Sequence, residues 1–223
     1  MVLGKRMGDK SASGVRQCGP GVPPEQLDRG LSGPQESLYQ TAMNTPRLGM
    51  LIFLGSETML FGGFVAAFLV FRLGAPVWPP PLQPRLPVGV TGVNTGVLLL
   101  SGYTMWRALH AARAGNRAGA VKSLAQTGLL GATFLAVQGY EWARLLTFGL
   151  TASSGIYGGT FYTLIGAHAV HVLGALIWLA LTLNGSSQSR YTARDQVRIS
   201  LLGMYWLFVV GLWPILYLIV YLV

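Results

Sequence analysis

Five long apolar runs, separated by basic connectors, constrain the fold of this chain more than any other feature. We place them at about residues 48–72, 89–110, 122–148, 156–183 and 199–223. Each exceeds the roughly 20 residues that a helix needs to cross the hydrocarbon core of a bilayer, and a backbone in lipid can satisfy its hydrogen bonds in this way. The pattern predicts an all-α membrane protein, a five-transmembrane-helix bundle over residues 46–223.

The composition supports a membrane protein and excludes several other classes. Hydrophobic residues make up 52% of the chain and charged residues only 10%, against about 25% charged residues in soluble domains. The net charge of +9 does not predict a nucleic-acid partner, because the basic residues lie in the gaps between apolar runs. The single cysteine, Cys18, can form neither an intrachain disulfide nor a zinc cluster.

Residues 1–45 differ from the remainder of the chain. They are rich in Gly, Pro, Ser and charge, and they hold too few large apolar residues to build a core. We predict a disordered polar N-terminal tail. Met43 is a candidate for the natural start, because the apolar pattern begins shortly after it.

The distribution of lysine and arginine predicts the orientation. With the N terminus inside, three of these residues fall outside: Arg72, Arg85 and Arg144. Thirteen fall inside: Lys5, Arg6, Lys10, Arg16, Arg29, Arg47, Arg107, Arg113, Arg117, Lys122, Arg190, Arg194 and Arg198. Because basic residues favour the cytoplasmic side, we predict the N terminus inside and the C terminus outside.

Two carboxylates lie within the apolar runs. Glu57 is about nine residues into the first run, roughly 13 Å deep, where an acidic side chain costs about 2.5–3.5 kcal/mol. It is either a functional or interface group, or a neutral, hydrogen-bonded structural carboxyl. Glu141 has Gln138 one turn earlier and Arg144 at i+3, so a structural pair with Arg144 is expected there, with a functional role as the alternative.

Two histidines, His168 and His171, lie in the apolar stretch GAHAVHVLGALIW. At i, i+3 they share one helical face, so they cannot bind a haem iron from opposite sides, and the third histidine, His110, lies at another depth. The carboxylate and histidine sets of di-iron bundles are also missing. We predict no redox metal in this chain and expect both imidazoles to hydrogen-bond across helices, to Glu141 or to lipid.

Five motifs occur in chain order at matching helix spacing. The first run holds a Ser-Glu pair (Ser56, Glu57), the second Asn-Thr and a later Ser, and the third Gln-x-x-Glu (Gln138, Glu141). The fourth reads Tyr-Gly-x-Thr-Phe and then Gly-x-His-x-x-His-Val, and the last begins Tyr-Trp-x-Phe-Val. Over about residues 46–223 the chain resembles the cytochrome c oxidase subunit III family, in its five-helix bacterial form.

The resemblance implies a non-catalytic subunit of a respiratory haem–copper terminal oxidase that transfers electrons from cytochrome c to oxygen and pumps protons. Haem and copper are then expected in partner subunits I and II, and this chain supports the stability of subunit I, phospholipid binding and proton uptake in the bacterial plasma membrane. Glu57, with Ser56, is the expected buried carboxylate near subunit I and proton entry. Gln138, Glu141, His168 and His171 are expected to make structural polar or lipid contacts.

Two departures and several alternatives accompany this resemblance. Seven-helix relatives have two further N-terminal helices that form one wall of a lipid cleft, and Leu207 and Val210 stand where relatives usually carry His and Asp. An accessory subunit of a quinol oxidase or of a nitric oxide reductase complex is an alternative within the family. A small membrane transporter with Glu57 as its proton site and a haem-binding membrane anchor are alternatives from other classes.

Overall fold

The computed structural model describes residues 33–78, 88–187 and 193–222. The chain divides into two compact units, Met1–Ala42 and Met43–Val223. In the first unit the described part is the helical stretch 33–42, and the predicted disorder of residues 1–32 lies outside the described residues.

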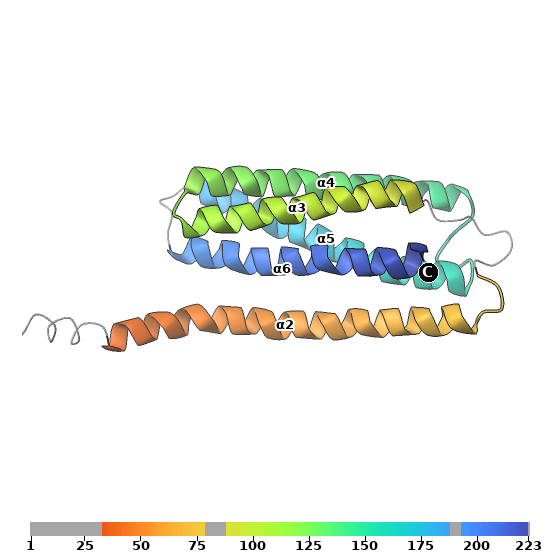
Figure 1. Ribbon diagram of the computed structural model, residues 1–223, viewed down its shortest axis with the longest axis horizontal. Helices are drawn as coiled ribbons and strands as arrows, with labels where there is room; N and C mark the ends of the chain where they lie inside the picture. Colours follow the sequence, from red (N-terminus) through yellow and green to blue (C-terminus); the bar gives the residue numbers. More distant parts are fainter. Residues whose placement is uncertain (1–32, 79–87, 188–192, 223) are drawn as a thin grey trace, which may run out of the picture. The chain divides into compact units, whose positions relative to one another are not determined.

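The described residues form five α-helices and one short π-helix (Figure 1). They are α2 (Gly33–Gly74), α3 (Val88–Arg113), α4 (Arg117–Thr147), α5 (Ile156–Ser187), α6 (Ala193–Tyr217) and η1 (Leu218–Leu222). No strand occurs in these parts of the chain. The prediction of an all-α, five-helix protein is confirmed.

Several helices extend beyond the apolar runs that identify them. Helix α2 begins at Gly33, so the predicted disorder up to residue 45 does not hold for residues 33–45. Pro34 lies in the first turn, where a missing N–H has no intrahelical partner to lose, and the residues that follow include good helix formers. Helix α4 begins at Arg117, because the side chain of Asn116 caps it by accepting a hydrogen bond from the Gly119 N–H at 2.9 Å.

Four described helical segments are long and apolar enough, by length and composition, to cross a membrane: Thr45–Gly74, Arg117–Thr147, Ile156–Asn184 and Asp195–Leu222. Helix α3, with 26 residues, has the length but is not among these four. Its polar side chains are buried inside the protein: Thr91, Asn94, Thr95, Ser101 and Thr104. The polarity of α3 is therefore directed toward its neighbouring helices rather than toward lipid.

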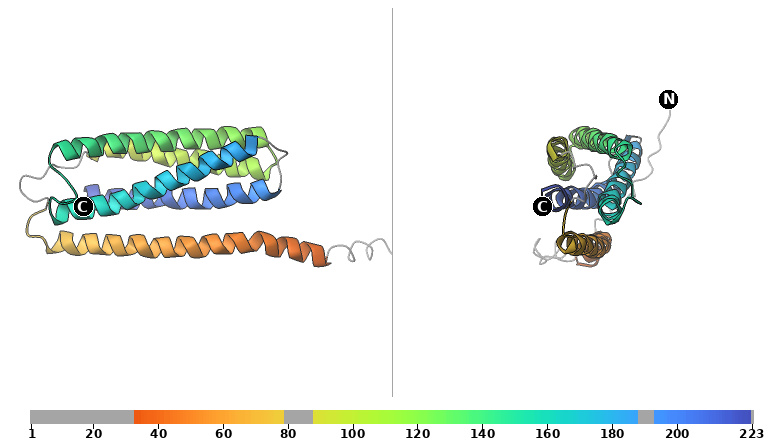
Figure 2. Two further views of the ribbon diagram at one scale, coloured as in Figure 1. Left: turned by 180° about the vertical axis from the view of Figure 1, so that it is seen from behind. Right: turned by 90° about the vertical axis from the view of Figure 1, so that its right-hand side faces the viewer.

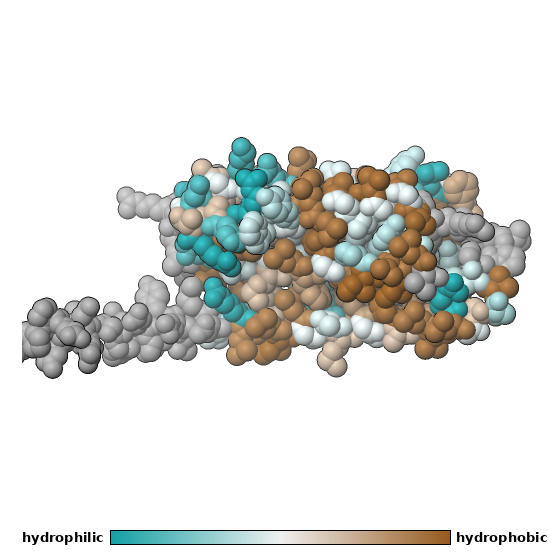
Figure 3. All heavy atoms as spheres, in the orientation of Figure 1, coloured by the Kyte–Doolittle hydropathy of each residue, from teal (hydrophilic) through white to brown (hydrophobic). Residues whose placement is uncertain are grey.

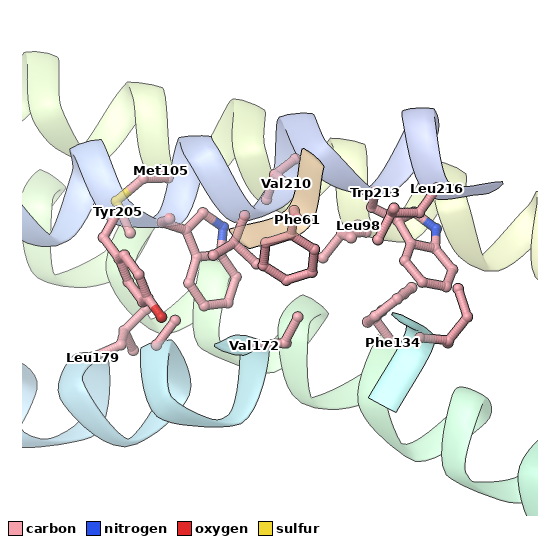
Figure 4. Close-up of a cluster of buried hydrophobic side chains, with 14 of the residues drawn as sticks. Phe61, Leu98, Met105, Phe134, Val172, Leu179, Tyr205, Val210, Trp213 and Leu216 are labelled. Atoms are coloured by element: carbon pink, nitrogen blue, oxygen red, sulfur yellow. The ribbon is translucent and has the colours of Figure 1, made fainter. Parts of the chain in front are cut away.

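Helices α3 to α6 form the core of the second unit. Helix α3 packs against α4 and α6, and α5 also packs against α4 and α6 (Figure 2). Trp206 and Trp213 of α6 are completely enclosed, and Figure 4 shows Trp213 beside Phe134. The Trp206 ring lies close to the backbone of Gly131, where an added Cβ would be 2.5 Å from the ring.

Helix α2 is buried far less than the other spans. Only 11% of its apolar window is covered, against 33–44% in the other three candidate spans. Its most deeply buried described side chains are aromatic: Phe61 and Phe68 are each 2% exposed, and the ring centroids of Phe53 and Tyr205 of α6 are 6.0 Å apart. Several aliphatic side chains of α2 also pack against the core, namely Met50, Leu54, Val65 and Leu69. Apolar side chains dominate much of the surface drawn in Figure 3, as expected for a protein surrounded by lipid or partner helices.

Candidate functional site

A carboxyl–imidazole pair joins α2 to α5. Glu57 Oε2 lies 2.9 Å from His171 Nε2, and the two side chains are 14% and 18% exposed. Glu57 is in the first half of the span Thr45–Gly74. The sequence identifies both residues as unusual, and the structure brings them together.

Hydrogen-bond valence determines how many protons this pair holds. His171 Nδ1 lies 2.7 Å from the carbonyl oxygen of Ala167. Because a carbonyl only accepts, Nδ1 must carry a proton. One further proton must then lie between Nε2 and the Glu57 carboxyl, either as a neutral acid donating to nitrogen or as an imidazolium donating to a carboxylate. In both forms the pair is neutral overall, which lowers the free-energy cost of placing Glu57 within a membrane span.

Phe61 encloses the pair from one side. It follows Glu57 by one helical turn and meets the His171 ring edge-on, with ring centroids 5.1 Å apart. It also meets the His168 ring at 6.5 Å. No sequence motif marks Phe61, although its i+4 spacing from Glu57 was a usable signal.

His168 has a different environment from His171. It is 1% exposed, and among the described residues neither of its ring nitrogens has a hydrogen-bond partner. Its ring stacks on Trp213 with centroids 4.9 Å apart and an interplanar angle of 29°. The expected hydrogen bond between helices is thus found for His171, with Glu57 and not Glu141 as its partner, and is not found for His168.

Glu141 and Gln138 lie on a different helix, α4. Glu141 is 4% exposed and its Oε1 lies 3.5 Å from Arg144 Nη1, so the expected pair within the helix is present. Gln138 Nε2 donates to the Tyr221 hydroxyl of η1 at 3.3 Å. Ser56 Oγ donates to the Phe53 carbonyl in its own helix at 2.7 Å. These three residues therefore make contacts separate from the Glu57–His171 pair.

The comparisons with known proteins agree on one family. The chain matches the family model of cytochrome c oxidase subunit III over residues 32–223. It is similar to cytochrome c oxidase subunit 3 of Synechocystis, with 33% identity over 78% of this chain and 74% of the relative. The protein of that name from Cyprinus carpio is 37% identical over 78% of this chain and 68% of its own length, and that from Papio hamadryas is 36% identical over 84% and 75%.

The chain belongs to the cytochrome c oxidase subunit III family. It is a subunit III of the haem–copper oxidase type, and this membership implies a complex with other oxidase subunits. The matched region begins at residue 32, next to the first residue of α2. Among the described residues of this subunit III, no group of three or more His, Cys, Asp or Glu side chains could hold a metal ion.

Three polar motif residues of α3 join helices of the core. Asn94 Nδ2 donates to the Phe134 carbonyl at 3.0 Å, and Thr95 and Ser101 accept the indole N–H groups of Trp213 and Trp206 at 2.8 and 3.2 Å. These bonds satisfy polar groups that lipid could not. The polar motif residues of α3 therefore make structural contacts between helices.

The two departures in α6 are accommodated by apolar packing. Val210 is 5% exposed, and its Cγ1 lies 3.1 Å from the position that a Cβ would take on Gly102 of α3. Leu207 is 38% exposed. The α3–α6 contact of this subunit III thus places a small residue opposite a branched apolar one.

Proposed function

We propose that this subunit III supports the redox-active subunits I and II of a respiratory oxidase and has no electron-carrying centre of its own. The complex would transfer electrons from cytochrome c to oxygen, with haem and copper in the partner chains. Family membership and the distribution of His and carboxylate side chains support this proposal. The described histidines have different partners: His171 bonds to Glu57, His168 stacks on Trp213, and His110 bonds to the Trp106 carbonyl at the end of α3.

The Glu57–His171 pair is the observation that carries the functional part of the proposal. The pair holds one shared proton, and it can bind a second one at the carboxyl if His171 becomes an imidazolium. A group that can gain and lose a proton within a membrane span can serve proton uptake by a neighbouring subunit. We therefore assign Glu57 as the protonatable carboxyl near subunit I, and His171 as the residue that positions it.

We propose that residues 46–223 form the membrane domain, with the N terminus inside and the C terminus outside a bacterial plasma membrane. The excess of lysine and arginine at the end of the unit that holds the α3–α4 connection supports this orientation. Helix α3 would then be a fifth span, since its 26 residues extend about 39 Å.

Substitution of Glu57 in the assembled oxidase tests this function. Gln has the same shape as Glu and keeps a hydrogen bond to His171 Nε2, but it cannot release a proton. In Glu57→Gln we expect assembly and initial oxygen consumption to be retained, while turnover declines severalfold faster during continuous assay. Glu141→Gln is the matched control, because it removes a buried carboxyl that lies outside the pair. Unchanged sustained turnover in Glu57→Gln would contradict the role in proton uptake.

A further inference from the structure

A seam of buried polar side chains lies between α3 and α4 and ends at η1. Three oxygen atoms in this seam have no hydrogen-bond partner among the described residues: Thr91 Oγ1, Asn94 Oδ1 and Gln138 Oε1. The three residues are only 1–3% exposed. A buried oxygen without a donor costs free energy, and native proteins keep few such atoms. The seam therefore needs a hydrogen-bond donor from outside these side chains.

The register of the two helices brings these oxygens together. Asn94 Nδ2 donates to the Phe134 carbonyl at 3.0 Å, which sets Asn94 opposite Phe134. Helices α3 and α4 are antiparallel neighbours, because residues 114–116 alone connect them. Thr91 precedes Asn94 by one turn and Gln138 follows Phe134 by one turn, so Thr91 faces Gln138 across the seam.

Tyr221 of η1 closes the seam at the end of the unit where α3 begins (Figure 1). Its hydroxyl accepts a hydrogen bond from Gln138 Nε2 at 3.3 Å. Thr91 lies beside the same hydroxyl but outside hydrogen-bonding geometry. Turning the Gln138 amide over would pair Oε1 with the hydroxyl and leave Nε2 without a partner instead. Either orientation of the amide therefore leaves one of its two polar atoms to be satisfied.

The polar groups of the seam continue toward the protein surface. Glu141 follows Gln138 by one turn on the same face of α4 and lies 3.5 Å from Arg144. The Arg144 side chain is 50% exposed, whereas the Glu141 side chain is 6% exposed. A small polar molecule therefore has a short polar route from the surface to the buried oxygens.

The chemistry of the unsatisfied atoms selects the ligand. Carbonyl oxygens of amides only accept hydrogen bonds, so the ligand must donate, and water can donate twice. A monovalent cation would need a negative charge beside it in the protein interior, but the Glu141 carboxylate is already paired with Arg144. Buried water commonly makes about three hydrogen bonds to polar groups of this kind.

We propose that the seam binds a water molecule that donates to Thr91 Oγ1 and Gln138 Oε1 and accepts the O–H of Tyr221. The water joins α3 to α4 and holds η1 against both helices. The site is separate from the Glu57–His171 pair and does not depend on the role proposed for that pair.

The sign of one isosteric substitution tests the proposal. Thr91→Val keeps the shape of the side chain and removes its hydroxyl. If the hydroxyl had no partner at all, this change would raise the thermal midpoint of the purified full chain in detergent. Because the hydroxyl bonds to the water, we expect the midpoint to fall by about 2–4 °C. Thr133→Val is the matched control, since Thr133 is exposed and its hydroxyl donates within its own helix. It should shift the midpoint by less than about 1 °C.

A structure of the assembled oxidase that shows ordered water gives a second readout. We expect density for one oxygen atom within about 3.2 Å of both Thr91 Oγ1 and Gln138 Oε1. A raised midpoint in Thr91→Val, an equal fall in Thr133→Val, or the lack of that density would overturn the proposal. Anomalous density at this position in crystals grown with a thallium(I) salt would also overturn it, because the ligand would then be a monovalent cation.

Discussion

Helix α2 and the core formed by helices α3, α4, α5 and α6 differ in how closely they pack. In the core, small residues allow close approach: a Cβ at Gly131 or Gly203 would meet a neighbouring side chain within 3 Å. On α2, a Cβ at Gly49, Gly55, Gly62 or Gly63 would meet no atom within 4 Å. The core is held by interdigitated side chains, whereas α2 is covered far less by its neighbours. The Glu57–His171 hydrogen bond is therefore important for the position of α2.

Removal of a core indole should give the largest effect. In Trp213→Ala we expect about 3–5 kcal/mol lower free energy of unfolding, because the change leaves a large cavity and removes the donor to Thr95. Met59→Ala on α2 is the control, since Met59 is 80% exposed and should shift stability by less than about 0.5 kcal/mol. Denaturation by SDS, followed by circular dichroism, measures both. Similar losses in the two variants would contradict the contrast between α2 and the core.

Addition of one methyl group should distinguish the two sets of glycines. Gly131→Ala would place Cβ against the Trp206 ring, so we expect a loss of about 1–3 kcal/mol from overpacking. Gly62→Ala should be neutral or stabilising by up to about 1 kcal/mol, because alanine favours the helix and the site is open. The difference in thermal midpoint between the two variants is the readout, and a stabilised Gly131→Ala would show that the Trp206 ring does not lie against Gly131.

A double-mutant cycle on Glu57 and His171 should give a smaller but specific coupling. Hydrogen bonds between membrane helices contribute about 0.6–1.7 kcal/mol, so we expect a coupling energy in that range for Glu57→Ala with His171→Ala. The same cycle on Glu57 and His168 should give about zero, because His168 lies against Trp213 and does not bond to Glu57. Equal coupling for both histidines would mean that the two imidazoles share one environment.

Ser56→Ala should have the smallest effect. The Ser56 hydroxyl is used within its own helix, where it donates to the Phe53 carbonyl, and alanine is the better helix former. We expect the free energy of unfolding to change by less than about 0.5 kcal/mol, measured as above. A loss greater than about 1 kcal/mol would show that Ser56 supports Glu57 in a way that its hydrogen bond does not indicate.

The number and type of the helices could be predicted from the sequence because hydropathy reports directly on lipid burial. The ends of the helices could be predicted less accurately. Residues 33–45 and the first turn of α6 are helical although they are polar. Apolar content indicates which part of a helix can lie in the membrane, and it does not indicate where the helix ends. Helix α3 is the converse case, since its polar side chains are covered by other helices rather than by lipid.

The members of the candidate site could be identified from the sequence, but their pairing could not. An i,i+3 spacing predicts that His168 and His171 share a face, yet a deviation of about 60° is enough to direct one ring toward Trp213 and the other toward Glu57. The relative register of α2 and α5 depends on tertiary packing, which no local pattern reports. The Glu141–Arg144 pair was predictable because both residues lie on one helix.

Metal analysis of the oxidase and of this subunit tests the central claim most directly. The complex is purified from membranes through a tag on this chain, and its haem and copper are measured before and after the tagged subunit is separated in detergent. We expect haem and copper in the intact complex and neither in the separated subunit, with the metals remaining on its partners. Stoichiometric haem or copper on the separated chain would contradict the claim that it acts by supporting redox-active neighbours.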